Sequence, residues 1–268
     1  MKKRPDTGRS NIPPWSGIRI PLEAMEDFVR SLFQAVGVSD DRANHMAVTL
    51  SANDLRCVFS HGTRQVSAYV PQIREGKANP NPEVSVVSES PATAVIDGDG
   101  GLGYFASHRG TELAIEKALE LAPDHANRVE RELIDAMAVR YVGRTDRAPQ
   151  LAIDTAYAEA MGRVYEAHPA DLDVGFFYAE SLMLLEPRRG NWDIERPEIQ
   201  RIHGILEEVL ARDIRHPGSC HLYIHATEST TQPNKAEACA DLLGEAIPGA
   251  SHINHMPSHT YNQVGRWG

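Results

Sequence analysis

Histidines gather in the last quarter of this 268-residue chain, where seven of the twelve follow residue 200. His221 and His225 are spaced i, i+4, and Glu228 follows at i+7, so all three fall on one face of a helix expected over 217–229. Three more lie around the start of a helix expected over 257–266: His252, His255 and His259.

Imidazoles one helical turn apart form a competent pair of ligands for a divalent metal, and a carboxylate and further histidines could complete the shell. No HExxH motif is present, so the pattern does not indicate a metalloprotease. The alternative is a packing network, in which the histidines lie between helices and bond to backbone groups or to Tyr223 and Tyr261. The sequence leaves both interpretations open.

A second motif has the spacing of a dinucleotide fingerprint: Gly98, Gly100 and Gly103 form GxGxxG between an expected strand and an expected helix. Asp97 and Asp99 would place two carboxylates where a pyrophosphate should lie, and like charges repel strongly in a partly dry site. No apolar run typical of a buried parallel strand precedes the motif. We therefore predict a tight turn with positive φ at several glycines.

The first half should contain helices and a small sheet. A first helix begins at Pro21 and ends at Gly37, with an apolar face of Leu22, Met25, Phe28, Val29, Leu32 and Phe33. Further helices are expected at 39–55, 65–74 and 106–119, and strands at 84–88 and 93–96. Residues 1–17 are polar and rich in Pro and Gly and should form a flexible arm.

From Asn127 onward the sequence predicts only helices, punctuated by prolines, at 127–141, 149–167, 172–186, 196–213, 217–229, 233–246 and 257–266. Short connections between them are typical of stacked helix pairs. The predicted fold class is mainly α: an α+β segment at 18–120, followed by an α-helical repeat array at 121–268.

Composition excludes several classes of protein. A net charge of -10 argues against nucleic-acid binding, and no stretch approaches the ~20 apolar residues of a membrane helix. The three cysteines, Cys57, Cys220 and Cys239, show no CxxC spacing and favour reduced thiols in a cytoplasmic protein.

Several motifs of the first half occur together: Asp54-Leu55-Arg56, Ser60-His61-Gly62, Tyr69, Gly76-Lys77-x-Asn79-Pro80 and Ala94-x-x-Asp97-Gly98. With them, residues about 20–117 resemble the N-terminal part of the malate/L-lactate dehydrogenase family, which includes ureidoglycolate dehydrogenases. The resemblance implies NAD or NADP as cofactor, bound on the family's own fold.

The resemblance also implies that Ser60, His61 and Arg64 line the cleft for substrate and cofactor, where an arginine fork can hold the carboxylate of a 2-oxo acid. Arg64 follows His61 by three residues, whereas the family pattern has four. The alternative for His61 is a helix-start histidine bonded to nearby backbone. The family's general base, a histidine in a His-Phe-Gly or His-Ser-Gly motif, is absent from the sequence, so we expect no turnover by this chain alone. An apolar sheet face would also favour a homodimer through this segment.

The second half carries Tyr157-Ala158-x-Ala160-Met161, His216-Pro217-Gly218 and His255-Met256-Pro257-Ser258-His259. These stretches resemble a bacterial family of tetratricopeptide-like repeats, which implies a scaffold that binds a protein or peptide. Tyr261 to Trp267 resembles the first helix of a repeat, so the array is expected to be truncated. A further alternative is a chimeric gene product, joined near residue 120, without an evolved joint function.

Overall fold

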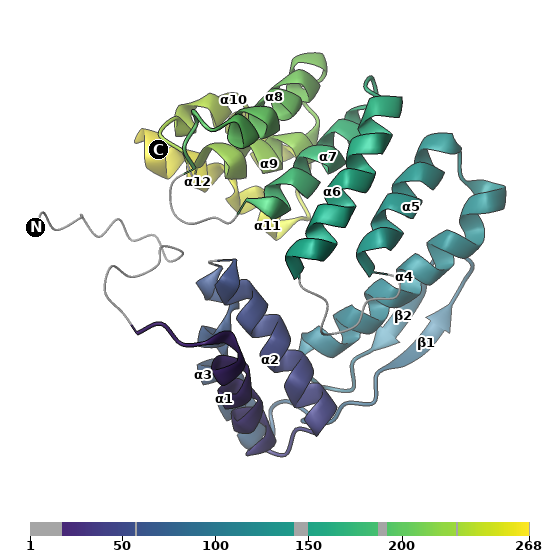
Figure 1. The fold of residues 1–268 in the computed structure, drawn as a ribbon, viewed down its shortest axis with the longest axis vertical. Coiled ribbons are helices and arrows are strands. Elements are labelled where there is room, and N and C mark those ends of the chain that lie inside the picture. Colours follow the sequence, from purple (N-terminus) through teal and green to yellow (C-terminus); the bar gives the residue numbers. More distant parts are fainter. Residues whose placement is uncertain (1–17, 57, 142–149, 187–191, 229, 268) are drawn as a thin grey trace, which may run out of the picture. The chain divides into compact units, whose positions relative to one another are not determined.

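The computed structural model describes residues 18–56, 58–141, 150–186, 192–228 and 230–267. The chain forms two compact units, residues 1–150 and 151–268 (Figure 1). The predicted arm at 1–17 and Cys57 lie outside the described residues. No helix in the described part combines the length and apolar character needed to cross a membrane.

Helices α1 (Leu22–Gln34) and α2 (Asp40–Leu55) pack against each other and, with α3 (Val66–Arg74), enclose the core of the first unit. Val29 and Phe33 of α1 are buried against Met46 and Leu50 of α2. The predicted apolar face of α1 is buried only in part, since Phe28 is 59% exposed. A helix at the surface faces the core with one stripe of apolar residues, and Phe28 lies at the edge of that stripe of α1.

A hairpin follows, formed by β1 (Ser85–Glu89) and β2 (Ala94–Asp97), which pair antiparallel with an irregularity between Val86 and Ser88. All residues of β1 are exposed. Helix α4 (Gly103–His125) packs beside the hairpin, and Lys117 donates a hydrogen bond to the Ser90 carbonyl at 3.0 Å (Figure 1). The strand before the glycine-rich turn, β2, pairs antiparallel in a two-stranded hairpin and alternates half-buried and exposed residues, whereas a dinucleotide fingerprint follows a buried parallel strand.

The glycine-rich turn is closed by its own carboxylates. Asp97 Oδ1 accepts a hydrogen bond from the Asp99 backbone N–H at 2.9 Å, and Asp99 Oδ2 accepts from Asn79 Nδ2 and from the Glu83 N–H, both at 2.9 Å. Positive φ was predicted at several glycines of the motif but occurs at Gly100 alone (65°), and unexpectedly at Asp99 (47°). The side-chain bonds of Asp99 hold it in that conformation, as is typical of Asp in turns.

Helix α4 is longer than predicted, and α5 (Arg128–Tyr141) packs against it. Ala122 in the last turn of α4 is buried, so contact with α5 carries the helix beyond the expected end at residue 119. The predicted domain boundary at 120/121 thus falls inside α4, whereas the structure divides the chain at residue 150.

The described part of the second unit is helical, as predicted, with bounds as follows: α6 (Gln150–Ala167), α7 (Leu172–Leu185), α8 (Pro197–Arg212), α9 (Pro217–Glu228), η3 (Pro233–Ala236), α10 (Glu237–Ala246), α11 (Ser251–His255) and α12 (Pro257–Val264). The single helix predicted over 233–246 is a 3-10 turn, η3, followed by α10, and the short helix α11 was not predicted. Helix α9 contacts α7, α8, α10, α12 and η3, and most of its residues are buried.

Replacing Phe33 by Ala should destabilise the first unit by about 3–5 kcal/mol, because the ring is fully buried and its removal leaves a cavity. Phe28→Ala on the same helix is the matched control and should change stability by less than about 0.5 kcal/mol, since that ring is mostly exposed. Urea unfolding followed by circular dichroism measures both. Equal effects would contradict the assignment of the core.

Candidate functional site

Ser60 and His61 lie on the 3-10 turn η1 (Phe59–His61), and Gly62 joins it to a second turn, η2 (Thr63–Gln65), between α2 and α3. The end of α2 fixes both turns. Asp54 Oδ2 accepts hydrogen bonds from the Thr63 N–H at 3.2 Å and from Thr63 Oγ1 at 2.5 Å. Asn53 Nδ2 donates to the His61 carbonyl at 2.9 Å. The backbone under the motif is therefore held by side chains of one helix.

Gly62 occupies a position that admits no side chain. A Cβ atom there would lie 1.7 Å from Asp54 Oδ1. The glycine lets the turn approach the carboxylate closely enough for Thr63 to bind it. Asp54 and the Ser-His-Gly motif, which the sequence analysis noted as separate motifs, thus form one unit.

The three predicted cleft residues lie on this turn. Ser60 Oγ is 2.9 Å from His61 Nδ1, and the imidazole is exposed. The bond joins His61 to a side-chain hydroxyl, where the alternative interpretation expected a backbone partner. Gln65 Nε2 donates to the Ser60 carbonyl at 2.5 Å, and Arg64 is exposed on η2.

A surface groove of about 310 Å³ runs beside the turn. Its lining is mostly apolar and comes from α1 and the turn: Met25, Phe28, Val29, Leu32, Asp54, Phe59, Thr63, Arg64 and Val66. The exposed part of α1 therefore lies beside the predicted cleft residues. Sequence reasoning missed Phe28 and Phe59 here because it treated apolar residues as core.

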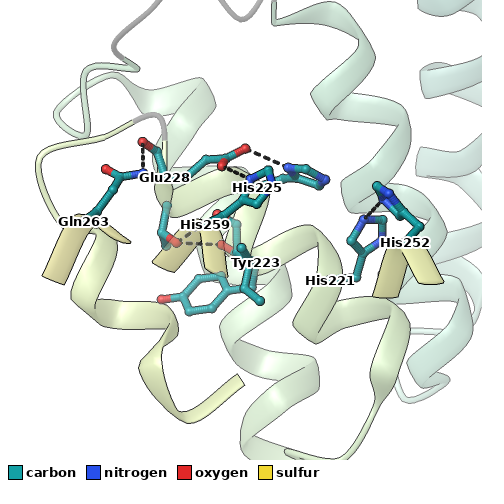
Figure 2. Close-up of polar contacts among 9 residues, drawn as sticks. His221, Tyr223, His225, Glu228, His252, His259 and Gln263 are labelled. Carbon is teal, nitrogen blue, oxygen red and sulfur yellow. Dashed lines mark hydrogen bonds and ion pairs between the residues drawn. The ribbon is translucent and has the colours of Figure 1, made fainter. Parts of the chain in front are cut away.

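The histidine cluster lies in the second unit, between α9 and the segment of α11 and α12 (Figure 2). His221 Nε2 lies 3.1 Å from His252 Nε2. Glu228 lies between two other imidazoles: its Oε1 is 2.7 Å from His225 Nδ1, and its Oε2 is 2.5 Å from His259 Nδ1. The structure thus joins histidines that are far apart in the sequence.

Glu228 is ionised in this setting. Its burial would raise the carboxyl pKa, but the hydrogen bonds with His225 and His259 outweigh burial and hold the pKa at about 2. The pKa of His252 is lowered, first by burial and then by His255 and His259. The cluster therefore favours neutral imidazole at His252, the form that binds metals.

Five of the six predicted ligands fall into two groups whose ligand atoms lie within 4.8 Å of one another: His221, His225 and His252, and His225, Glu228 and His259. His255 belongs to neither, although its ring centroid is 4.8 Å from that of His252. The tyrosines expected as packing partners bind carboxylates: Tyr223 donates to Glu207 at 2.5 Å, and Tyr261 to Asp241 at 2.7 Å.

Part of the first unit is similar in sequence to known proteins. Residues 20–122 match the sequence profile described as malate/L-lactate dehydrogenase. Malate dehydrogenase from Pyrococcus horikoshii is 39% identical over 101 residues, which cover 38% of this chain and 28% of that protein. L-sulfolactate dehydrogenase from Methanocaldococcus jannaschii is 38% identical over 96 residues, covering 36% of this chain and 28% of that protein.

The matches to solved structures cover the same share of this chain. Malate dehydrogenase from P. horikoshii OT3 shares 38% identity over 38% of this chain and 30% of its own, with a TM-score of 0.37. Malate dehydrogenase from Entamoeba histolytica shares 30% identity over 38% and 28%, with a TM-score of 0.36. Residues 20–122 are therefore similar to the malate/L-lactate dehydrogenase family, and the chain spans less than a third of the length of the relatives it matches.

Gly62→Ala should destabilise the first unit by roughly 1–3 kcal/mol, because the added methyl group overlaps the Asp54 carboxylate and breaks its bonds with Thr63. Gly103→Ala is the control, since a Cβ there meets nothing within 4 Å, and it should change stability by less than about 0.5 kcal/mol. Thermal unfolding compares the two. A neutral Gly62→Ala would contradict the close approach of Asp54.

Proposed function

We propose that residues 20–122 supply one wall of the cleft of an NAD(P)-dependent 2-hydroxy acid dehydrogenase, with Ser60, His61 and Arg64 toward the substrate. The observation that carries the proposal is the preorganised turn, in which Asn53 and Asp54 fix the backbone while the His61 imidazole is exposed. A fixed turn that presents polar side chains to solvent suits a binding role. The groove beside it supplies an adjoining apolar surface.

The similar dehydrogenases support a substrate class for this proposal. They act on malate or sulfolactate, two 2-hydroxy acids that each carry a second acidic group. Arg64 is the candidate for the 2-carboxylate, because a guanidinium can bind both carboxylate oxygens. Oxidation moves a hydride from C2 to the nicotinamide, and the hydroxyl proton must go to a base. The sequence has no His-Phe-Gly or His-Ser-Gly motif, so we infer that this chain alone does not complete the reaction.

A homodimer through the first unit is a second part of the proposal. Three valines of the hairpin are exposed: Val86 at 38%, Val87 at 64% and Val95 at 57%. Exposed β-branched residues on a two-stranded sheet favour burial against another surface. A second copy of the chain would cover them.

The second unit offers an alternative function, that of a tetratricopeptide-like scaffold for a protein or peptide. The observation that favours it is the packing of helices adjacent in sequence, α7 with α8, α8 with α9, and α9 with α10. Such succession is typical of helical repeat proteins, which bind partners on an extended surface. This alternative is supported if a partner that binds the intact chain still binds after substitutions on the hairpin.

The purified chain should show no NAD(P)-dependent oxidation of L-malate, L-lactate or L-sulfolactate, because the sequence has no His-Phe-Gly or His-Ser-Gly motif to supply the family's general base. P. horikoshii malate dehydrogenase under the same conditions is the positive control, and NAD(P)H absorbance is the measurement. Robust turnover that His61→Ala abolishes would overturn the inactivity and identify His61 as the proton acceptor.

The double variant Val87→Lys, Val95→Lys should shift the chain from dimer to monomer, because charged groups cannot be buried in an apolar contact without a partner. Sedimentation velocity measures the change, with Val139→Lys on α5 as the control, since that valine is also exposed at 47%. A monomeric parent chain would refute the dimer.

A further inference from the structure

We propose that His221, His225 and His252 bind a divalent transition-metal ion, with zinc the preferred one. Glu228 orients His225 from outside the shell, and the fourth position is open to water or to an anionic ligand. This site lies in the second unit and is independent of the dehydrogenase-type cleft.

The distances suit a tetrahedral shell. Zinc binds imidazole nitrogen at about 2.0–2.1 Å, which puts two such nitrogens about 3.3 Å apart. His221 Nε2 and His252 Nε2 are 3.1 Å apart, and the ligand atom of His225 is within 4.8 Å of both. Small rotations of the imidazoles would bring the three nitrogens onto one ion.

The carboxylate of Glu228 sets the tautomer of His225. Glu228 Oε1 lies 2.7 Å from His225 Nδ1, and a carboxylate oxygen accepts hydrogen bonds, so the geometry points to Nδ1 as the donor. The lone pair of the neutral ring then lies on Nε2, the remaining ligand atom. A carboxylate that accepts from the far nitrogen of a ligating histidine is the usual support of such sites and raises the basicity of the ligand.

The elements also suit a metal centre. His221 and His225 share one face of α9, a helix buried on most of its surface, so their backbone is rigid. His252 comes from α11 and is exposed, which leaves a route for the ion. Three imidazoles favour zinc, cobalt, nickel or copper over magnesium and calcium, which prefer oxygen ligands.

The second group, His225, Glu228 and His259, is the weaker candidate. Both imidazoles there use Nδ1 to bond the same carboxylate. An ion at that place would have to replace both hydrogen bonds to Glu228, whereas an ion held by His221, His225 and His252 would replace only the contact between His221 Nε2 and His252 Nε2.

The test uses the full chain without an affinity tag, treated with a chelator and dialysed. Isothermal titration with Zn²⁺ should give one ion per chain, and Co²⁺ should give the intense visible absorption of a tetrahedral site. Octahedral cobalt spectra, or no saturable Zn²⁺ binding, would overturn the proposal.

Variants locate the ion. His221→Ala and His252→Ala should each lose measurable Zn²⁺ binding, and Glu228→Gln should weaken it about 10–100-fold through loss of the bond that orients His225. His255→Ala is the matched control, because this histidine is close to His252 yet outside both groups, and it should bind Zn²⁺ like the parent chain.

Circular dichroism of the metal-free variants checks that each is folded, and His252 is exposed, so its replacement should not disturb the core. Binding that survives His221→Ala but is lost in His259→Ala would assign the ion to the second group and refute this one. Equal weakening by all variants, His255→Ala included, would indicate a nonspecific surface patch and also refute it.

Discussion

The enclosure of α9 sets the conditions for the second unit. Seven of the twelve residues of α9, a helix in contact with five other elements, are buried, so their polar groups need protein partners. Thr227 Oγ1 donates a hydrogen bond to the Tyr223 carbonyl at 2.8 Å, and the Tyr223 hydroxyl donates one to Glu207. Burial, together with this bond to Glu207, raises the pKa of Tyr223. The cluster face of α9 is the exception, because His221 and His225 meet residues of α11 and α12 that remain accessible. Buried backbone and accessible imidazoles therefore coexist on that face.

In the first unit, a single carboxylate holds a turn in place. Asp54 lies at the end of α2, and the turn that follows wraps around it so closely that only glycine fits at residue 62. The half-buried Ser60 and the exposed His61 lie on the turn that Asp54 anchors through Thr63. A substitution at Asp54 would therefore disturb the cleft side chains without removing any of them.

Much of this arrangement could be predicted from the sequence. The helices of both units follow from apolar periodicity and from proline and glycine positions, and His221, His225 and Glu228 share a face as their spacing requires. Pairing across the chain could not be predicted: nothing local places His252 beside His221, or Glu228 against His259. Local rules also failed where tertiary packing prevailed, as in the extension of α4 and the exposure of Phe28. The positive φ of Asp99 arises from bonds to Asn79 and Glu83, distant in sequence.

Helix α4 has a consequence for how such a chain can change in evolution. The likeness to dehydrogenases stops at residue 122, yet the helix continues to His125 and α5 packs on it. A junction within a helix transmits rotational phase, because each residue turns the helix by about 100°. Insertion or loss of one residue at this place would swing the start of α5 around the axis of α4 and remove its apolar residues from their contact. The contact between α4 and α5 therefore depends on the number of residues in α4 as well as on their types.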